Sequence, residues 1–565
     1  MGEGAETARQ PVAVTLADRV RRTAADRPER VAFHHRDRAL TWAELDRAID
    51  GAAADLLCRT GESRPVPDGG AAPVPGGGSP VVAGTPARVA IALGNTPEFV
   101  IALLATMRAG LVAVPVNPGA AGPELRHVLA DSQAAVLLAT ERVGGLVEPI
   151  RADLPALQDV HIGLAASDGP GGTDPGQVVA APDPDDLAVL LYTAGTEGRP
   201  KGAMLTHRCL LANHEQLGGI SPPVVGPDDV LLLALPLFHA YGLGSGLGAV
   251  AYHGACGVLI DDFDPADALD RIARHRVTIL LGVPSMFLAW SLLPNAGTAL
   301  AAVRLAVCGA APLDAGTADR FAVATGHPPV VGYGLTEAAP VLTSTLASPA
   351  PKRGSIGRPL PGVRIRLVGA GGERLWSSDP DDPDLDAEAD DWELDPESAG
   401  TDPGEIVVRG ANLFAGYWPD GRGGPGADGW WATGDIAYAD ADGDLFLVDR
   451  LGELILVNGF NVYPREVELA LDAHPEVLES AVTAAPHPYT GQTVRAYVVR
   501  APGAGVTEAV LRAHCAERLA RFKCPTAVEF VDALPHSAIG KVRKTLLRPA
   551  PGQRDGRSTA EVADG

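Results

Sequence analysis

The order of apolar and polar positions along the chain predicts alternating strands and helices. Short runs rich in Val, Ile and Leu predict buried strands, and apolar residues three or four positions apart predict amphipathic helices. Strands are expected at residues 89–93, 112–116, 134–138, 277–281 and 305–308, and helices at 98–107 and 124–131. Thr41 and Glu44 form a capping-box pattern, which predicts a helix start after Thr41. Such alternation is typical of parallel sheets covered by helices.

The C-terminal part of the chain shows a different pattern. Residues 404–408 and 444–448 predict strands of a more antiparallel region, and residues 464–471, 494–499 and 510–519 predict a small α+β unit. We therefore predict an α/β fold class, with a large N-terminal domain of parallel-type sheets and covering helices at residues 1–450. A small α+β domain is expected at residues 451–548, followed by a disordered tail at 549–565.

Two segments interrupt this order and predict flexible inserts. The first, at about residues 62–86, is rich in Pro and Gly. The second, at about residues 376–403, holds twelve Asp or Glu and no Lys or Arg, which is half of the net charge of −24. Because a run of like charges buries little apolar surface, this insert is expected to be solvated.

Composition and charge exclude several classes of function. A hydrophobic content of 46% with 21% charged residues is typical of a soluble globular protein, and the net charge of −24 argues against nucleic acid or an anionic membrane as the main partner. The uncharged stretch at residues 230–259 contains six glycines, so it predicts a buried strand and helix rather than a membrane span. The six cysteines form no C-x-x-C pair, and the N-terminus lacks a signal-peptide core, which together favour a reducing, cytoplasmic setting.

One glycine-rich segment carries a cation that the chain otherwise avoids. Lysine occurs only at positions 201, 352, 523, 541 and 544, among 46 basic residues. Lys201 lies near the end of the stretch YTAGTEGRPKG, which follows an apolar run at residues 187–191. Backbone N–H groups of such a loop, together with one compact ammonium, can surround phosphate groups. The spacing excludes a Walker loop, which requires G-x-x-x-x-G-K-[ST].

This stretch resembles the phosphate loop of the AMP-forming adenylating superfamily, and seven further segments resemble that family's motifs in the same order. They are LPLFHAYG with His239, CGAAPL with Gly309, Ala310 and Ala311, GYGLTE with Tyr333, Gly334, Thr336 and Glu337, TGD with Asp435, VDR with Arg450, NGFNVYPREVE with Gly459, and GKVRK with Lys541. The resemblance spans residues 192–544 and is closest in character to the bacterial fatty acyl-CoA ligases.

The resemblance implies a role for each of these residues. The phosphates of ATP would be bound by Thr193, Gly195, Thr196, Gly198 and Lys201, while Thr336 would contact a phosphate and Glu337 would bind Mg²⁺. The adenine would be bound by Gly309, Ala310, Ala311, Tyr333 and Gly334, and the ribose by Asp435. His239 would gate the acyl pocket, Arg450 would precede a hinge, Gly459 would help form the thiolation site, and Lys541 would enter the adenylation site. It also implies a distorted β-barrel in the large domain and a mobile small domain.

These roles fit the activation of a carboxylate in two steps. A carboxylate does not react with a thiol at neutral pH because its leaving group would be oxide, whereas transfer of AMP makes a phosphate the leaving group. The first step brings an anion to a polyanion, so Mg²⁺ on Glu337, the loop N–H groups, Thr196, Lys201 and Lys541 would compensate charge. The CoA thiol would then displace AMP after the small domain turns. The expected catalytic residues are Lys541, Thr336, Glu337 and His239, and the expected cofactors are ATP, Mg²⁺ and CoA.

The pocket motif favours an apolar acid as substrate. Amino-acid-activating members of the superfamily carry an aspartate after the pocket phenylalanine, whereas Phe238 is followed here by His239. Small apolar neighbours favour a medium- to long-chain fatty acid, with an aryl acid as the alternative. A carrier-protein phosphopantetheine in place of CoA also stays open. Ala194, Glu197 and Gly452 depart from the family's pattern and leave a catalytically silent sensor as a third alternative.

Overall fold

The computed structural model describes residues 14–61, 86–164, 182–193, 200–379, 400–450, 453–457, 460–487, 490–537 and 541–547. The chain divides into two compact units. The first comprises residues 1–402, 406–433 and 439–446, and the second comprises residues 403–405, 434–438 and 447–565. Most of the two expected inserts and all of the expected tail lie outside the described residues, and the domain boundary at residue 450 stays a prediction.

The largest sheet of the first unit has nine strands, of which six are parallel. Its strands are, in spatial order, β15 (Arg358–Pro359), β14 (Val341–Ser344), β13 (Val330–Gly334), β12 (Leu305–Cys308), β11 (Ile279–Gly282), β9 (Val230–Leu233), β10 (Cys256–Leu259), β1 (Val31–His35) and β2 (Arg38–Thr41). The antiparallel strands β2, β14 and β15 lie toward its two edges. Since parallel strands point the same way, the carboxyl ends of β9, β11, β12 and β13 meet at one edge of the sheet.

A second sheet of the first unit has six strands. They are, in order, β6 (Asp159–Ile162), β5 (Val136–Ala139), β3 (Arg88–Ala92), β4 (Val112–Pro115), β7 (Leu187–Thr193) and β8 (Lys201–Thr206). The first five are parallel, and β8 returns antiparallel to β7. Every residue of β4 and β5 is buried, which explains why these strands read as continuous apolar runs rather than as alternation.

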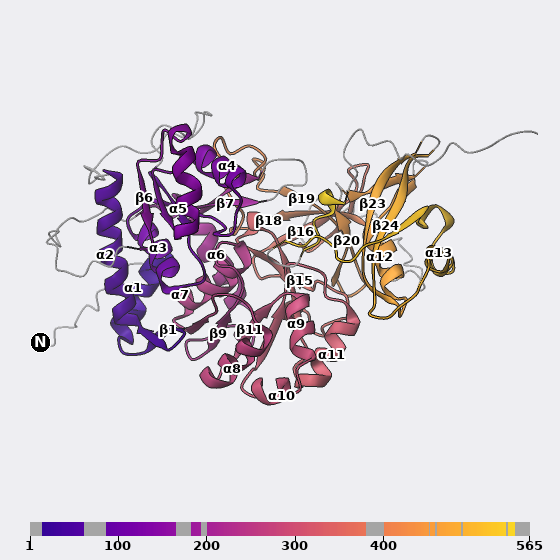
Figure 1. Cartoon of the computed structure of the whole chain (residues 1–565), viewed down its shortest axis with the longest axis horizontal. Helices are drawn as coiled ribbons and strands as arrows, with labels where there is room; N and C mark the ends of the chain where they lie inside the picture. The colour runs from indigo at the N-terminus through magenta and orange to yellow at the C-terminus, as the bar shows by residue number, and fades with distance from the viewer. Residues whose placement is uncertain are drawn as a thin grey trace, which may run out of the picture. The chain divides into compact units, whose positions relative to one another are not determined.

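Helices pack on both sheets through their apolar faces. They are α1 (Leu16–Asp26), α2 (Trp42–Thr60), α3 (Pro97–Arg108), α4 (Gly122–Ser132), α5 (Glu141–Val147), α6 (His207–Gly218), α7 (Ala249–His253), α8 (Pro265–His275), α9 (Pro284–Ser291), α10 (Ala296–Ala299) and α11 (Ala315–Thr325), with the 3₁₀ turns η1 (Glu148–Asp153), η3 (Thr336–Ala338) and η4 (Thr345–Ala347) and the π-helix η2 (Tyr241–Gly248). The predicted capping box is confirmed at Thr41, and α2 buries Leu45, Ile49 and Leu56. Figure 1 shows α8 to α11 gathered along one side of β9 and β11.

A five-stranded sheet and a small α+β core complete the fold. The five-stranded sheet consists of β17 (Arg374–Ser377), β16 (Arg364–Val368), β18 (Gly404–Arg409), β19 (Trp431–Ala439) and β20 (Leu445–Arg450), in that order, and the expected distorted β-barrel stays a prediction. The second contains β21 (Ile455–Val457), β22 (Phe460–Val462), β23 (Val477–His487), β24 (Gly491–Arg500), β25 (Ala527–Phe530), α12 (Pro464–Asp472), α13 (Glu508–Ala516) and the turns η7 (Arg521–Lys523) and η8 (Lys544–Leu546). The α/β fold class with a smaller C-terminal α+β part is confirmed.

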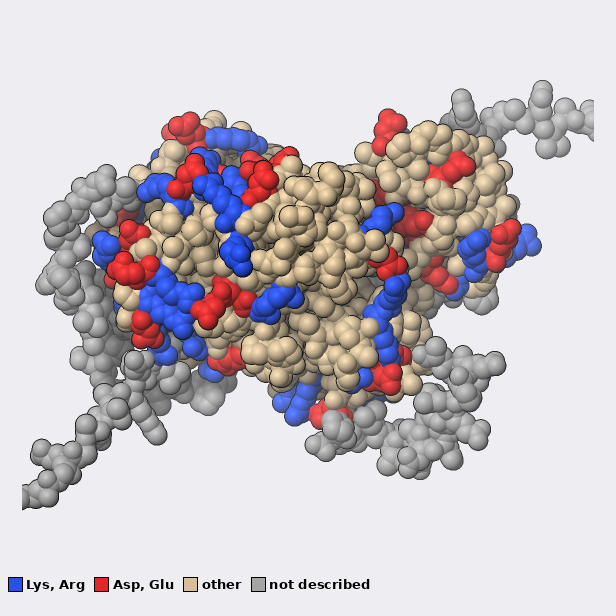
Figure 2. Space-filling model, turned by 90° about the horizontal axis from the view of Figure 1, so that it is seen from below, with Lys and Arg blue, Asp and Glu red and all other residues tan. Residues whose placement is uncertain are grey.

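The surface mixes charges of both signs, and the uncharged stretch is internal. On the face drawn in Figure 2, Lys and Arg side chains are interspersed with Asp and Glu. Residues 230–259 form β9, η2, α7 and β10, as the sequence indicated. Among the described residues, no helix is long and apolar enough to cross a membrane.

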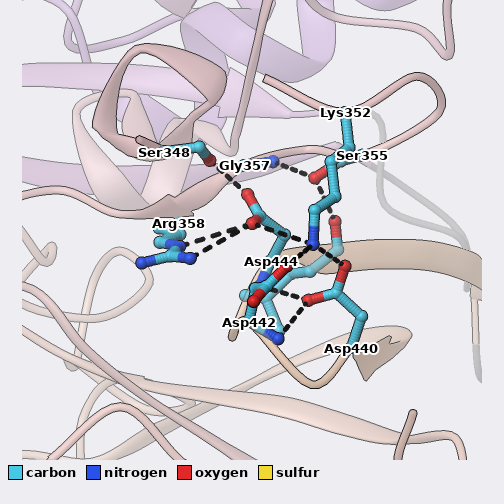
Figure 3. A network of polar contacts seen from close by, with 9 residues as sticks. Ser348, Lys352, Ser355, Gly357, Arg358, Asp440, Asp442 and Asp444 are labelled. Carbon is cyan, nitrogen blue, oxygen red and sulfur yellow. Dashed lines mark hydrogen bonds and ion pairs between the residues drawn. The ribbon is translucent and has the colours of Figure 1, made fainter. Parts of the chain in front are cut away.

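Lys352, which the sequence left without a role, is part of a polar network around Asp444 (Figure 3). Asp444 is 1% exposed; it accepts a hydrogen bond from the Ser348 hydroxyl and lies 3.4 Å from Arg358. The Lys352 ammonium lies 2.6 Å from Asp440 Oδ2 and 3.7 Å from Asp444 Oδ2. A buried carboxylate is costly unless it is paired. The network therefore fixes the connection between β14 and β15 against the turn that precedes β20.

Candidate active site

Three of the predicted motifs follow strands that end at one edge of the nine-stranded sheet. His239 follows β9, Gly309 follows β12, and Tyr333 and Gly334 close β13. The Gly309 amide donates a hydrogen bond of 3.1 Å to the Gly282 carbonyl at the end of β11, which ties neighbouring strand ends together. Ligands of open α/β sheets bind outside the carboxyl ends of the strands, so this edge is the candidate site.

Tyr241, the first residue of the π-helix, packs against Gly309. A β-carbon added at Gly309 would lie 3.1 Å from Cε1 and Cζ of the Tyr241 ring. The Tyr241 hydroxyl donates a hydrogen bond of 3.1 Å to the Val307 carbonyl, and the side chain is 9% exposed. Burial raises the pKa of the Tyr241 phenol well above its usual value, so the hydroxyl remains a donor. His239, the residue predicted to gate the acyl pocket, is half-buried, and its Nδ1 accepts a hydrogen bond from the Tyr241 amide.

The glycines of the π-helix are closely packed against the rest of the unit. An added β-carbon at Gly242 would lie 2.3 Å from the Pro236 carbonyl oxygen. At Gly244 it would lie 2.6 Å from Cδ of Pro340. These positions are glycine because the helix approaches its neighbours closely, so their small size does not by itself indicate an open channel for an aliphatic chain.

The loop predicted to bind adenine contains a strained residue. Ala310 has a φ of +66°, a left-handed conformation that is unfavourable for a residue with a β-carbon. Ala310 is exposed and Ala311 half-buried. Such strain concentrates at functional sites, where the surrounding structure imposes it. Across the sheet edge, Thr336 and Glu337 lie in η3, directly after β13.

The predicted phosphate loop connects the two strands of an antiparallel hairpin. Thr193 ends β7, Lys201 begins β8, and the two residues lie opposite each other in the register. Gly195, Thr196 and Gly198 lie outside the described residues. A strand rather than a helix follows this loop, so no helix N-terminus directly continues it, and Lys201 supplies an ammonium at the start of that strand.

Side chains from α4 form hydrogen bonds to Tyr192 and Pro200, on either side of the predicted phosphate loop. The Tyr192 hydroxyl donates a hydrogen bond of 2.6 Å to Asp131 Oδ2, and His127 Nε2 lies 2.8 Å from the Pro200 carbonyl oxygen. Burial, followed by the hydrogen bond to Asp131, raises the pKa of Tyr192 far above its usual value, so its hydroxyl remains a donor. The Trp418 amide donates to the Gly202 carbonyl at 2.8 Å.

Glu337 is a buried carboxylate with a tyrosine partner that the sequence analysis missed. It is 8% exposed, and its Oε1 accepts a hydrogen bond of 2.7 Å from the Tyr417 hydroxyl. Burial and the adjacent Glu337 carboxylate raise the pKa of Tyr417, which keeps the phenol protonated. The Lys201 ammonium lies 5.4 Å from the centroid of the same ring. The only available sequence signal was the aromatic pair Tyr417-Trp418 before Pro419.

The donor set at Glu337 fits a magnesium ion carried by a nucleotide. Mg²⁺ is commonly bound through one or two carboxylates together with substrate phosphates. Glu337 would provide one carboxylate, whose Oε1 accepts the hydrogen bond from the Tyr417 hydroxyl. Within the described ranges, no group of three or more His, Cys, Asp or Glu side chains could hold a metal ion.

The remaining predicted residues belong to the second unit, where each is described by itself. Asp435 lies in β19 and is 2% exposed, Arg450 closes β20, and Gly459 lies outside the described residues. The Lys541 amide donates to Ser537 Oγ at 3.1 Å.

Lys544, which is close to Lys541 in the chain, forms ion pairs with two carboxylates. Its ammonium lies 2.9 Å from Glu453 Oε2 and 2.7 Å from Glu468 Oε1. This double ion pair anchors the segment that carries Lys541 to the core of its own unit.

Comparison with known proteins identifies relatives over nearly the whole chain. The family model of AMP-binding enzymes matches residues 83–418, and the model of the AMP-binding enzyme C-terminal domain matches residues 466–541. A feruloyl-CoA synthase of Amycolatopsis sp is 36% identical over 525 residues, which cover 92% of this chain and 96% of that protein. A long-chain-fatty-acid–CoA ligase of Escherichia coli O157:H7 is 33% identical over 515 residues, covering 83% and 87%. The ATP-bound crystal structure of MatB from Rhodopseudomonas palustris is similar with a TM-score of 0.77 and 30% identity, covering 94% of this chain and 98% of that one.

Proposed function

Because the chain belongs to the AMP-binding enzyme family and is an acyl-CoA ligase that uses ATP, Mg²⁺ and CoA, we propose that its substrate is an apolar carboxylic acid with an aromatic ring. The sequence favoured a medium- to long-chain fatty acid because small and apolar residues surround the pocket motif. Two of these residues, Gly242 and Gly244, are closely packed, so their small size does not support an open channel.

The observation that carries the proposal is the contact between Tyr241 and Gly309. The Tyr241 ring is fixed at its far end by the bond to Val307, so it offers a flat, rigid wall beside the loop that follows β12. Flat aromatic walls pack well against planar rings. The relative named feruloyl-CoA synthase, 96% of whose length is covered by the match, supports the same class of acid.

A fatty acid is the second candidate. The relative from Escherichia coli acts, by its name, on long-chain fatty acids. Leu243 and Leu247 of the π-helix are apolar and each 1% exposed, and the Leu243 amide donates to the carbonyl of the proposed gate residue His239 at 2.8 Å. An aliphatic chain would require these side chains to part.

In the first step, a carboxylate oxygen of the acid forms a bond to the α-phosphorus, and pyrophosphate leaves with the electron pair of the broken P–O bond. Lys201 and Thr336 would compensate phosphate charge, and Glu337 would hold Mg²⁺, which supplies positive charge beside the phosphates when bound. Lys541 would add a second ammonium. No general base is required, because the attacking carboxylate is already ionised.

In the second step, the CoA sulfur forms a bond to the acyl carbon and AMP leaves with the electron pair of the broken C–O bond. The thiol proton passes to solvent. We propose that the small domain turns after Arg450 between the steps, so that Lys541 leaves and the segment around Gly459 completes the thiolation site.

Competition between acids tests the substrate proposal. Hydroxycinnamates, benzoates and fatty acids of six to sixteen carbons are compared by kcat/KM from pyrophosphate release with saturating ATP and CoA. We expect the best aryl acid to exceed the best fatty acid by about tenfold or more, the scale on which pocket contacts discriminate. A fatty acid as the best substrate would contradict the proposal and favour the second candidate. Release of acyl-adenylate without acyl-CoA would instead indicate a carrier-protein acceptor.

A further inference from the structure

The Tyr417 hydroxyl is placed to orient one carboxylate. It donates to Glu337 Oε1 at 2.7 Å, and Glu337 is 8% exposed. A donor on one oxygen restricts rotation about the terminal bond of the glutamate and so fixes the direction of the other oxygen. Hydrogen-bond partners of metal-binding carboxylates act in this way, and their loss weakens metal binding.

Tyr417 is itself fixed by the backbone on both sides. The Ala415 amide donates to the Met204 carbonyl at 2.9 Å, and the Trp418 amide donates to the Gly202 carbonyl at 2.8 Å. These bonds join the chain around Tyr417 to β8, the strand that leaves the phosphate loop. On the other side, the Phe414 amide donates to the Glu337 carbonyl at 2.8 Å. The segment therefore links β8 to η3.

The same ring contacts the lysine of the phosphate loop. The Lys201 ammonium lies 5.4 Å from the centroid of the Tyr417 ring, within the range of a cation–π contact. The Phe414 ring packs against Tyr417 at 5.0 Å between centroids. Tyr417 thus contacts one anion and one cation, and the proposed function gives both of them a role at the phosphates of ATP.

We infer that Tyr417 is a positioning residue that aligns Glu337 for the magnesium–nucleotide complex and couples it to Lys201. The inference rests on the metal role proposed for Glu337. The Tyr417 hydroxyl acts on Glu337 and the Tyr417 ring acts on Lys201, so the two contributions can be separated by substitution.

The test is Tyr417→Phe, which removes the hydroxyl and keeps the ring. Binding of α,β-methylene-ATP to the full chain is measured by isothermal titration calorimetry over a series of MgCl₂ concentrations, without acid or CoA. We expect the Mg²⁺ concentration for half-maximal enhancement of nucleotide binding to rise by about tenfold or more, the usual effect of losing such a partner. Binding without Mg²⁺ should stay near that of the unsubstituted protein, because the ring and Lys201 remain.

Two control variants make the result decisive. Tyr252→Phe removes another hydrogen-bonded tyrosine hydroxyl of the same unit, one that accepts from Arg19, and should leave the Mg²⁺ midpoint unchanged. Glu337→Gln should abolish the Mg²⁺ enhancement. A normal midpoint in Tyr417→Phe, with the enhancement lost in Glu337→Gln, would overturn the inference and keep the proposed metal site. A normal midpoint in Glu337→Gln would overturn both. A lower melting temperature with a normal midpoint would assign Tyr417 a structural role only.

Discussion

The ring of Tyr241 lies against the α-carbon face of Gly309, so closely that a β-carbon there would come within 3.1 Å of Cε1 and Cζ. Tyr241 begins the π-helix and Gly309 follows β12, so the contact joins two motifs that are far apart in the sequence. The proposed substrate class depends on the Tyr241 ring acting as a flat wall at this contact.

Gly309→Ala should therefore impair use of the acid. The new methyl group must displace the Tyr241 ring, and overpacking of this kind typically costs about 1–3 kcal/mol. We expect kcat/KM for the best acid to fall by roughly tenfold, mainly through KM, in steady-state assays. The matched control is Gly145→Ala in α5, where nothing lies within 4 Å of the added carbon. Equal kcat/KM in the two variants would show that the wall does not contact the substrate.

Ala310→Gly should stabilise the first unit. The φ of +66° strains alanine but suits glycine, and relief of that strain exceeds the extra entropy of glycine in the unfolded chain. The free energy of unfolding is expected to rise by a few tenths to about 1 kcal/mol. In calorimetry this would raise the melting temperature of the transition in which the first unit unfolds. Gly326→Ala, at a φ of +79° with open space around it, should shift that transition downward. A downward shift for Ala310→Gly would contradict strain at this loop.

The local features of this fold could be predicted from the sequence, because they depend on neighbouring residues. Thr41 and Glu44 cap α2 as their spacing indicated, and the apolar run at residues 305–308 coincides with β12. Contacts between distant segments could not be predicted. Tyr417 reaches Glu337 across 80 positions, and nothing in the local pattern around either residue encodes that pairing.

Close packing between distant segments could not be predicted from the sequence either. Gly242 and Gly244 were among the small apolar neighbours that favoured a fatty acid, whereas backbone and proline atoms approach both positions closely. Lys352 gave no signal of its own, since its role depends on the buried position of Asp444. A residue type indicates which contacts are possible, and the fold decides which of them form.

His214 should make stability fall as the pH is lowered. Burial, with smaller effects of His253 and Arg19, lowers its pKa to about 3 from an unfolded value near 6.5. Between these values the unfolded chain binds a proton that the folded chain does not, so stability declines with acidification by up to about 1.4 kcal/mol per pH unit. His214→Gln should show a shallower decline of melting temperature from pH 6.5 to 4.5. Parallel profiles of the two proteins would exclude His214 as a source of the decline.

Lys541→Ala should separate the two half-reactions. Loss of one preorganised cation is expected to slow acyl-adenylate formation by about 10²–10³-fold, while thiolation of preformed acyl-adenylate is spared. Both steps are followed by rapid quench. Arg543→Ala, an exposed position two residues further along, serves as the control and should affect neither step. Equal damage to both steps by Lys541→Ala would assign Lys541 a structural role.

Product analysis by mass spectrometry tests whether the protein ligates an aryl acid to CoA at the expense of ATP. The full chain is incubated with ATP, Mg²⁺, CoA and a mixed panel of aryl and fatty acids, and acyl-CoA, AMP and acyl-adenylate are measured together. We predict equal amounts of acyl-CoA and AMP, with an aryl-CoA as the leading product, and no acyl-CoA when ATP is omitted. ATP left unconsumed with every acid would contradict this prediction and support a silent nucleotide or acyl sensor.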